Sequence, residues 1–355
     1  MISNTFWSGR RVFMTGHTGF KGSWLSLWLQ SLGASVRGYS LPAPTTPALF
    51  HEAGVVHGME SLEGDIRNGP ALRAALVDFR PEVVIHMAAQ PLVRLSYLEP
   101  VETYSTNVMG TLNLFEAVRA SDTVRSVVNV TTDKCYENRE WVWGYREADS
   151  MGGFDPYSSS KGCAELITSA YRQSFLQHGQ VALASVRAGN VIGGGDWALD
   201  RLVPDILRAF EKGQSVTIRN PRATRPWQHV LEPLSGYLML AERLHTDCQT
   251  FAEAWNFGPA DQDCRSVEWI VSRLAQAWGN GATWIVQTDE QLHEAQYLKL
   301  DCSKARQRLH WSPRWSLETA LPRIVRWHRA WHAGEDVRTS CLADINDYSG
   351  PEEIP

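Results

Sequence analysis

The chain has 355 residues, of which 43% are hydrophobic and 21% charged, and its formal net charge is -5 at pH 7. This composition is ordinary for a soluble globular protein, and the length suits one large domain or two modest ones. Without a basic block, the chain gives no reason to expect a nucleic-acid partner. No apolar run approaches the roughly 20 residues that span a bilayer. The first residues do not form a secretory signal.

Six cysteines are scattered along the chain, and no two of them form a C-x-x-C pair. This pattern favours reduced thiols in a cytosol over a disulfide framework or a zinc site. We therefore expect a cytoplasmic protein with no metal centre and no membrane partner.

The first expected element is a strand at 12–15 that leads into Gly16, Gly19 and Gly22, followed by a helical pattern to about residue 32. A turn that cradles a pyrophosphate needs backbone without Cβ. The helix behind it offers free N–H groups and the positive end of its dipole. A strand, turn and helix without a ligand would show much of the same pattern. Its position at the start of the chain, directly after a strand, favours dinucleotide binding.

Strands and helices then alternate along the first half of the chain. Residues 41–47 contain three prolines and should interrupt regular structure. Further strands are expected at 34–39, 82–89, 126–132 and 182–187, and helices at 71–79, about 101–120 and from about 157 onward. Because helices of crossover length separate the strands, the sheet should be parallel and doubly wound, in a Rossmann-type α/β fold.

From about residue 190 the alternation loosens. Helical patterns recur near 202–210, 234–244, 267–277 and 317–331, with short strands between them. This predicts a smaller α/β substrate-binding lobe over the carboxyl ends of the first lobe's strands, where ligands bind in such folds. The expected organisation is a dinucleotide-binding part over 1–188, a second lobe over 189–340 interleaved with it, and a loose tail over 341–355.

A tyrosine and a lysine, Tyr157 and Lys161, open a predicted helix after Pro156. Their spacing puts both side chains on one helical face, one turn apart. A lysine ammonium beside a phenol favours the phenolate, which should lower the pKa of Tyr157 toward that of a base active near neutrality. Thr132 ends a predicted strand at the same sheet edge as Gly16, where its hydroxyl could share the proton of a substrate alcohol. An exposed Tyr–Lys pair is the simpler alternative, but the three features together predict a catalytic centre.

Together these motifs resemble the extended short-chain dehydrogenase/reductases, and most of all their nucleotide-sugar 4,6-dehydratases. The resemblance covers nearly the whole chain. It rests on Gly16-x-x-Gly19-x-x-Gly22, Asp65-Ile66, Ala88-Ala89, Thr132 and Tyr157-x-x-x-Lys161, and in the second lobe on Arg187 to Val191 and Arg225 to Val230. Two stretches, 131–136 and 193–197, resemble the branch that acts on CDP-glucose. The resemblance implies a lyase of deoxysugar biosynthesis whose substrate is a nucleotide sugar.

The implied reaction is an internal oxidation and reduction. Tyr157 takes the proton of the sugar 4-hydroxyl while NAD⁺ takes hydride from C4. Loss of water from C6 then needs an acid, and Asp133 is the candidate, provided that burial raises its pKa. The hydride finally returns to C6. Relatives in the dTDP-glucose branch carry Glu as the C5 base at the next position, where this chain has Lys134, so the identity of the base is open, with Lys134 as the candidate.

The predicted cofactor contacts follow from the glycine turn and from the resemblance. They are Gly16, His17, Thr18, Gly19, Phe20, Lys21, Gly22, Asp65, Ile66, Ala88, Ala89, Gln90, Thr131, Tyr157 and Lys161. The second strand ends without the acidic residue that holds a ribose 2′-hydroxyl, and Arg37 or Lys21 could attract a 2′-phosphate. NAD is expected by resemblance and because the redox cycle is closed, with NADP as the alternative.

The resemblance also implies contacts to the substrate. The predicted residues are Arg94, Ser96, Asn190, Leu202, Val203 and Arg225. The Arg225 guanidinium suits a diphosphate, which it can bind through two parallel hydrogen bonds. Leu202 and Val203 should frame the nucleobase, and the preference for cytosine rests on resemblance alone. Arg219 and Arg222 are expected to be solvated surface charges.

Three other functions stay open from the sequence. They are a 4,6-dehydratase of a dTDP-, UDP- or GDP-sugar, a nucleotide-sugar 4-epimerase, and a catalytically silent dinucleotide sensor. The pair Asp133–Lys134 argues against an epimerase, which needs no acid at C6. The presence of both Tyr157 and Lys161 argues against a sensor. In relatives, the helices matching 101–120 and 157–174 form a dimer bundle, so a homodimer or homotetramer is expected.

Overall fold

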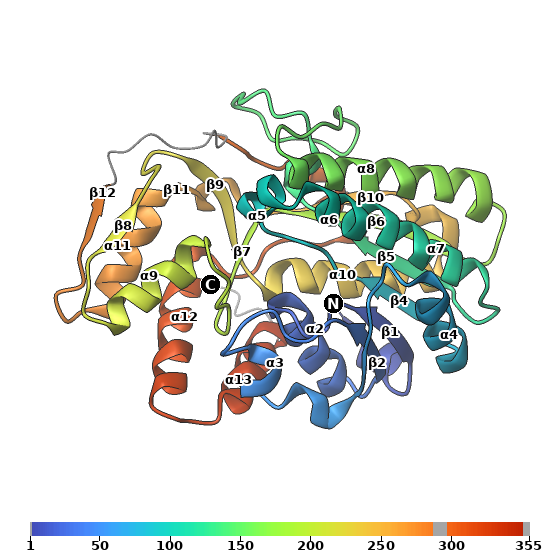
Figure 1. Ribbon diagram of the computed structural model, residues 1–355, viewed down its shortest axis with the longest axis horizontal. Helices are drawn as coiled ribbons and strands as arrows, with labels where there is room; N and C mark the ends of the chain where they lie inside the picture. The colour runs from blue at the N-terminus through green and yellow to red at the C-terminus, as the bar shows by residue number, and fades with distance from the viewer. Residues whose placement is uncertain (1, 287–296, 351–355) are drawn as a thin grey trace.

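A parallel sheet of seven strands forms the centre of the molecule, in the order β10-β6-β5-β4-β1-β2-β3 (Figure 1). The computed structural model describes residues 2–286 and 297–350. The strands are β1 Arg11–Thr15, β2 Ser35–Ser40, β3 Glu60–Glu63, β4 Val83–His86, β5 Ser126–Val130, β6 Ala182–Ala188 and β10 Ala254–Phe257. Strands β4, β5 and β6 are buried at every position, which explains their nearly continuous apolar sequence. The predicted parallel, doubly wound Rossmann-type sheet is confirmed.

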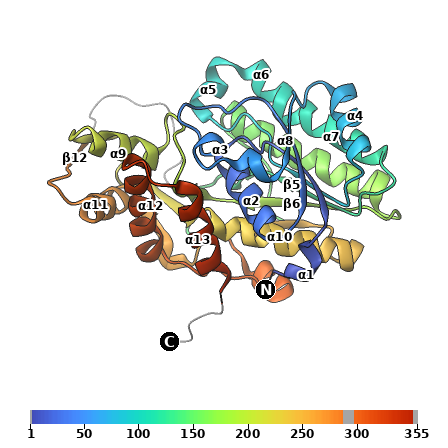
Figure 2. The same cartoon turned by 90° about the horizontal axis from the view of Figure 1, so that it is seen from below.

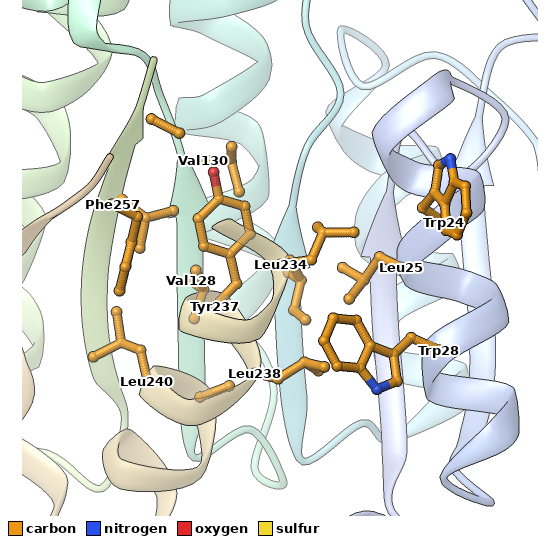
Figure 3. Close-up of a cluster of buried hydrophobic side chains, with 14 of the residues drawn as sticks. Trp24, Leu25, Trp28, Val128, Val130, Leu234, Tyr237, Leu238, Leu240 and Phe257 are labelled. Atoms are coloured by element: carbon orange, nitrogen blue, oxygen red, sulfur yellow. The ribbon is translucent and has the colours of Figure 1, made fainter. Parts of the chain in front are cut away.

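Helices cover both faces of this sheet (Figures 1 and 2). One face carries α4 Gly69–Phe79, α7 Gly110–Arg119 and α8 Pro156–Tyr171, and the other carries α2 Phe20–Ser31 and α10 Leu231–Thr246. Alternate residues of a strand face opposite layers: Phe13 packs with the first group and Met14 with the second. Figure 3 shows part of this second layer, in which Tyr237 of α10 lies beside Val128 and Val130 of β5. Leu25 and Trp28 of α2 lie on the other side of Leu234 of α10 in the same cluster.

The helix predicted over about 101–120 is present but contains a wider turn. It consists of α6 Pro100–Tyr104, a π-helical turn at Ser105–Met109 and α7. Within that turn the buried side chain of Asn107 donates to Ser160 on α8 (2.9 Å) and accepts from the backbone N–H of Gln90 (2.9 Å). These bonds link the turn to α8 and to the chain after β4, and π-turns of this kind are common near functional sites.

A smaller lobe has its own sheets and core. It contains the three-stranded sheet β11-β9-β7 and the pair β12-β8. Its elements are β7 Asn190–Ile192, α9 Leu202–Glu211, β8 Val216–Ile218, β9 Thr224–His229, β11 Cys264–Ser266, α11 Val267–Trp278, β12 Trp284–Val286 and α12 Leu317–His332. Two elements from the same half of the sequence, α10 and β10, instead pack on or pair with the large sheet. The predicted domain boundary at residue 188 stays a prediction.

The tail predicted from residue 341 is wrong as far as Ser349. Helix α13, Val337–Ser349, packs against α2 and α12 and buries Cys341, Ile345 and Tyr348. Asp344 on α13 pairs with Arg323 of α12 at 2.7 Å. The apolar residues recur at helical spacing, but polar residues between them hide the pattern. Residues 351–355, the rest of the predicted tail, lie outside the described residues.

Two strands of the large sheet, β3 and β10, were not predicted individually. Strand β3 is polar at both ends, and β10 is a short run in the half of the chain where strands and helices no longer alternate regularly. Strand β3 forms because it extends the sheet beside β2, with Arg37 opposite Glu60. Within the described ranges, no helix combines the length and apolarity needed to cross a bilayer.

A buried carboxylate, Glu232, ties α10 to α13. It accepts hydrogen bonds from the Tyr348 hydroxyl (2.7 Å) and from the backbone N–H groups of Arg314 (2.9 Å) and Trp315 (2.7 Å). Burial nevertheless raises the pKa of Glu232 from 4.5 to about 7. The folded protein therefore binds this proton more tightly than the unfolded chain. The resulting stability is fully present below pH 4.5 and is lost as the pH rises to about 7.

We expect this titration to remove about 3 kcal/mol from the free energy of unfolding between those two pH values. Glu232→Gln should abolish that part of the pH dependence, although the variant is less stable overall because an amide offers one acceptor oxygen instead of two. Urea unfolding of both proteins across the acidic to neutral range measures the difference. Parallel stability curves would contradict the assignment.

Candidate active site

The two lobes enclose a cavity of about 1570 Å³ at the carboxyl ends of β1, β4, β5 and β6. This is where ligands bind in open parallel sheets. The first lobe contributes the glycine turn after β1 and the segment after β5, and the second lobe contributes residues of β7, β9 and α9. The predicted closure of the smaller lobe over the sheet edge is therefore present.

The glycine turn between β1 and α2 has the form of an anion cradle. Gly16 has a φ of +77°, and a Cβ there would lie 2.6 Å from the backbone nitrogen of Ala88. A Cβ on Gly22 would lie 2.1 Å from the carbonyl oxygen of Gly16. The turn is thus close-packed on the protein side, while Gly19 lines the cavity and caps α2 without a side-chain hydrogen bond. Its helix N-terminus suits a phosphate group.

Most of the predicted cofactor residues line this cavity. They are Gly16, Thr18, Gly19, Phe20, Lys21, Gly22, Asp65, Ile66, Ala88, Ala89, Thr131, Tyr157 and Lys161. His17 and Gln90 do not. The His17 ring fills the space over Gly38, and its Nε2 atom lies 2.7 Å from the Ser61 hydroxyl. The Gln90 amide donates to Thr103 (2.9 Å), so both side chains support the surrounding backbone instead.

Lys21 lies deeper in the cavity than a residue that only flanks a phosphate turn. Its Nζ atom donates to the hydroxyl of Tyr237 (3.2 Å), which points toward the Val130 end of β5 (Figure 3). Burial and the nearby cations Lys161 and Arg201 lower the pKa of Lys21 to about 7. The amine therefore stands close to the reacting groups as well as to the glycine turn.

Tyr157 and Lys161 face the cavity from the first turns of α8, as their spacing predicts. The Asp155 side chain caps this helix by accepting from the backbone N–H of Ser158 (2.9 Å), and Lys161 donates to the carbonyl oxygen of Val130 (3.2 Å). Thr132, two residues after β5, lines the same cavity, and its hydroxyl is close enough to Tyr157 to act on the pKa of that phenol. The helix start and the strand end thus bring together the three side chains singled out from the sequence.

The expected low pKa of Tyr157 is wrong for the protein alone. Burial raises the pKa of Tyr157 to about 12, although the nearby Thr132 hydroxyl and the charge of Arg201 act in the opposite direction. Burial also lowers the pKa of Lys161 to about 8, against the nearby charge of Glu165. Desolvation is the largest cause for both groups, because both are buried in the wall of the cavity.

Asp133 has the environment of a proton donor. Its side chain is buried, Oδ1 accepts from the Thr132 hydroxyl (3.0 Å), and Oδ2 has no hydrogen-bond donor among the described residues. Burial raises the pKa of Asp133, although Lys134 and Arg225 act to lower it. A raised pKa favours the protonated carboxyl group, which is the form that can protonate a leaving hydroxyl. Lys134 lines the same cavity beside it.

The predicted substrate residues fall into two groups. Arg94, Asn190, Leu202, Val203 and Arg225 line the cavity, whereas Ser96 is fully buried and donates to the carbonyl oxygen of Val93 (2.6 Å). Arg94 on the first lobe pairs with Asp200 on the second at 3.3 Å. Arg219 pairs with the same Asp200 oxygen at 3.2 Å and also lines the cavity, so its expected place on the solvated surface is wrong.

A family model described as GDP-mannose 4,6 dehydratase matches residues 13–324 of this chain. The chain belongs to that family. One family relative, CDP-glucose 4,6-dehydratase from Salmonella typhimurium, is 60% identical over 354 residues, which is 98% of each chain. A dTDP-glucose 4,6-dehydratase from Xanthomonas campestris is 23% identical over 89% of this chain and 92% of its own length.

Two solved structures are similar in fold to this member of the GDP-mannose 4,6 dehydratase family. A dTDP-glucose 4,6-dehydratase from Streptomyces venezuelae, solved with NAD, has a TM-score of 0.79 at 21% identity and covers 92% of this chain and 99% of its own. UDP-glucose 4-epimerase from Thermotoga maritima, solved with UDP-glucose, has a TM-score of 0.80 at 21% identity over 91% and 99% of the two chains.

The structure of this family member also places residues at the site that the sequence analysis missed. Arg201, at the start of α9, lines the cavity and pairs with Asp196 at 2.9 Å. Its charge acts on both Tyr157 and Lys21. The sequence offered one signal for this arginine: Asp196 and Arg201 lie at the two ends of the loop that follows the glycines at 193–195. That signal is weak, because solvent-exposed loops often have the same pattern.

Proposed function

We propose that this protein is a CDP-glucose 4,6-dehydratase, which converts CDP-D-glucose to CDP-4-keto-6-deoxy-D-glucose and water. The observation that carries the proposal is the 60% identity, over 98% of both chains, to the Salmonella typhimurium enzyme of that name. The cavity supports it, because it joins a tyrosine and lysine to a buried carboxyl group, Asp133. A 4-epimerase has no use for an acid at C6.

We propose NAD as the cofactor, which takes up hydride from C4 of the sugar and returns it to C6. The close-packed glycine turn and the uncapped start of α2 would hold its pyrophosphate, and Lys161 its nicotinamide ribose. Arg37, which could have attracted the 2′-phosphate of NADP, already pairs with Glu60 at 2.8 Å and Asp78 at 2.7 Å. This occupation of Arg37 favours NAD.

The first proton transfer belongs to Tyr157. Its hydroxyl oxygen accepts the proton of the sugar 4-hydroxyl, and Thr132 orients that hydroxyl from the end of β5. A phenol whose pKa burial has raised to about 12 needs cationic help to act near neutrality. The charge of Arg201 acts in that direction, and we assign the same role to the Lys161 ammonium one turn away along α8. Oxidation at C4 then makes the C5 proton acidic.

The loss of water belongs to the segment after β5. Asp133 donates its proton to the leaving 6-hydroxyl, and neutral Lys134 removes the proton at C5 and returns it to C5 when hydride is added at C6. Both side chains line the cavity directly beside Thr132, so the acid and the base reach adjacent carbons of one bound sugar. In the second lobe, Arg225 and Asn190 bind the diphosphate, and Leu202 and Val203 frame the nucleobase.

The test offers the purified protein CDP-, dTDP-, UDP- and GDP-linked sugars separately, each labelled with deuterium at C4. We expect a 4-keto-6-deoxy product from CDP-glucose alone, with the label in the new methyl group. Product from another nucleotide sugar would overturn the CDP assignment. A C4 epimer without loss of water would overturn the reaction, and no product from any of them would revive the sensor.

We also propose that two copies of the chain associate through α6 and α8, which lie side by side on the outside of the large lobe (Figure 1). Apolar side chains on these helices and the turns that follow them are exposed: Val101 78%, Met109 50%, Leu166 60% and Phe175 51%. A patch of this kind marks an interaction surface.

The six free cysteines agree with a reducing, cytoplasmic location.

The double variant Val101→Arg, Leu166→Arg should weaken self-association at least about tenfold, because two charges would be buried in an apolar contact. Analytical ultracentrifugation of both proteins over a range of concentrations measures this. Ile285→Arg on β12 changes a similarly exposed apolar residue in the other lobe and serves as the control. An unchanged association constant for the double variant would place the interface elsewhere.

A further inference from the structure

Two buried charged side chains, Glu165 and Arg187, lie next to the residues that carry the proposed reaction, and that reaction does not use them. Glu165 stands on α8 one turn beyond Lys161 and two turns beyond Tyr157, so the three side chains share one helical face. Arg187 stands near the end of β6. Its Nη2 atom lies 2.8 Å from Oε2 of Glu165, and each side chain is only 4% exposed.

Glu165 also holds the strand end that carries the reacting groups. The hydroxyl of Thr131 donates to Oε1 (2.5 Å), and the hydroxyl of Ser185 donates to Oε2 (2.7 Å). Thr131 directly precedes Thr132 and Asp133. The carboxylate therefore connects the end of β5 to α8, the helix that carries Tyr157 and Lys161.

The charge of Glu165 acts on Lys161, whose cationic form burial disfavours. Other titratable groups surround the pair: Cys135 after β5, Lys21 on α2, His86 on β4 and Arg172 after α8. Lys21 is close to Lys161 and opposes its positive charge. Burial lowers the pKa of His86 to about 3, so that ring is neutral. Glu165 thus supplies negative charge on the side of Lys161 away from the cavity.

A buried ion pair adds little net stability, because desolvation of the two charges offsets their attraction. An apolar pair of similar volume would fill the same space between α8 and β6. The pair instead has a position that suits a role in the reaction. Glu165 stands one turn from Lys161 and accepts a hydrogen bond from Thr131, the residue before Thr132.

We propose that Glu165 is a positioning residue for the dehydration, with Arg187 as its counterion. It fixes Thr132 and Asp133 against α8 and keeps Lys161 cationic during turnover. This inference rests on the proposed function, since it assigns a charged role to Lys161 in the same reaction.

The test is the pH profile of kcat, measured with CDP-glucose for two single variants. One variant removes a negative charge, and the other removes a positive charge. Glu165→Gln removes negative charge near Lys161, whose pKa is about 8, so the alkaline limb should move about one unit to lower pH. At pH 7 this shift alone should about halve kcat, and at pH 9 it should lower kcat by nearly tenfold. Arg187→Gln leaves Glu165 uncompensated, so the same limb should move to higher pH. Loss of packing alone would not move the limb in opposite directions.

Two further variants separate charge from shape. Glu165→Asp keeps the charge and should keep the limb in place, even if the shorter side chain lowers kcat. Asp344→Asn removes another buried carboxylate, paired with Arg323 on α12, and should lower the melting temperature without moving the limb. Thermal unfolding of every variant shows which are folded, and Arg187→Gln carries the test if Glu165→Gln does not fold.

The role of Glu165 would be overturned if the alkaline limb of the kcat profile stayed in place in both Glu165→Gln and Arg187→Gln. It would also be overturned if the limb moved in the same direction in both variants. Activity of the unchanged protein is the separate control. If that protein forms no product from CDP-glucose, the proposed function fails. If it does and the limbs do not separate, only the present inference fails.

Discussion

Replacing Tyr157 by phenylalanine should lower kcat by about three orders of magnitude while the protein stays folded. The variant keeps the ring that packs in the cavity wall and loses only the oxygen that takes the proton of the sugar 4-hydroxyl. A positioned acid–base group contributes about 10²- to 10⁴-fold to a rate. Lys161 still donates to the carbonyl oxygen of Val130, so cofactor binding should change little.

The measurement combines the rate of product formation with cofactor affinity from calorimetry. Tyr348→Phe is the matched control, because it also removes a buried hydroxyl, the one that donates to Glu232, but lies far from the cavity. It should cost stability and leave kcat near that of the unchanged protein. A Tyr157→Phe protein with more than about a tenth of full activity would remove Tyr157 as the base.

Asp133→Asn should separate the two halves of the reaction. Oxidation at C4 needs Tyr157 and Lys161 and should proceed, whereas an amide cannot donate a proton to the leaving 6-hydroxyl as a carboxylic acid does. Loss of water should slow by about 10²- to 10³-fold. Because hydride would then be taken up but not returned, reduced nicotinamide should accumulate after mixing with substrate, and its absorbance follows the build-up directly.

Asp263→Asn is the control for this variant. Asp263 is also largely buried, and it accepts from the backbone N–H of Leu317 (3.0 Å) in the smaller lobe. Its change should produce no build-up of reduced cofactor. If Asp133→Asn turned over at the normal rate without any such build-up, another group would have to protonate the leaving hydroxyl. If it formed no reduced cofactor at all, Asp133 would act in the first step instead.

The parts of the fold that could be predicted are those with a short-range signal. Strand β5 is a run of apolar residues buried on both faces, and the glycine turn after β1 is a fixed spacing within seven residues. The strands that were missed have no such signal. Glu60–Glu63 reads as a polar loop, and it becomes a strand because β2 offers it a free edge. Helix α13 was missed because its buried apolar positions are separated by charged residues that pair with α12.

The candidate site divides in the same way. Tyr157, Lys161 and Thr132 were predicted because their residue types and their positions along the chain are enough to suggest a catalytic role. Arg201 and Asp196 were not, because a loop arginine carries no such mark until the fold brings it to the cavity. The pairing of Arg94 with Asp200 likewise joins two lobes that are distant in sequence.

The parallel sheet, the phosphate turn and the helical face shared by Tyr157 and Lys161 could be predicted from the amino-acid order, since periodicity and glycine spacing act over a few neighbouring residues. The proton affinities of the reacting groups could not, because they depend on the folded surroundings of each group. The directions in which the pKa values of Tyr157 and Asp133 shift depend on how far the folded chain buries each group. That burial, and the approach of Arg187 to Glu165, come from contacts between distant segments, which no local pattern records.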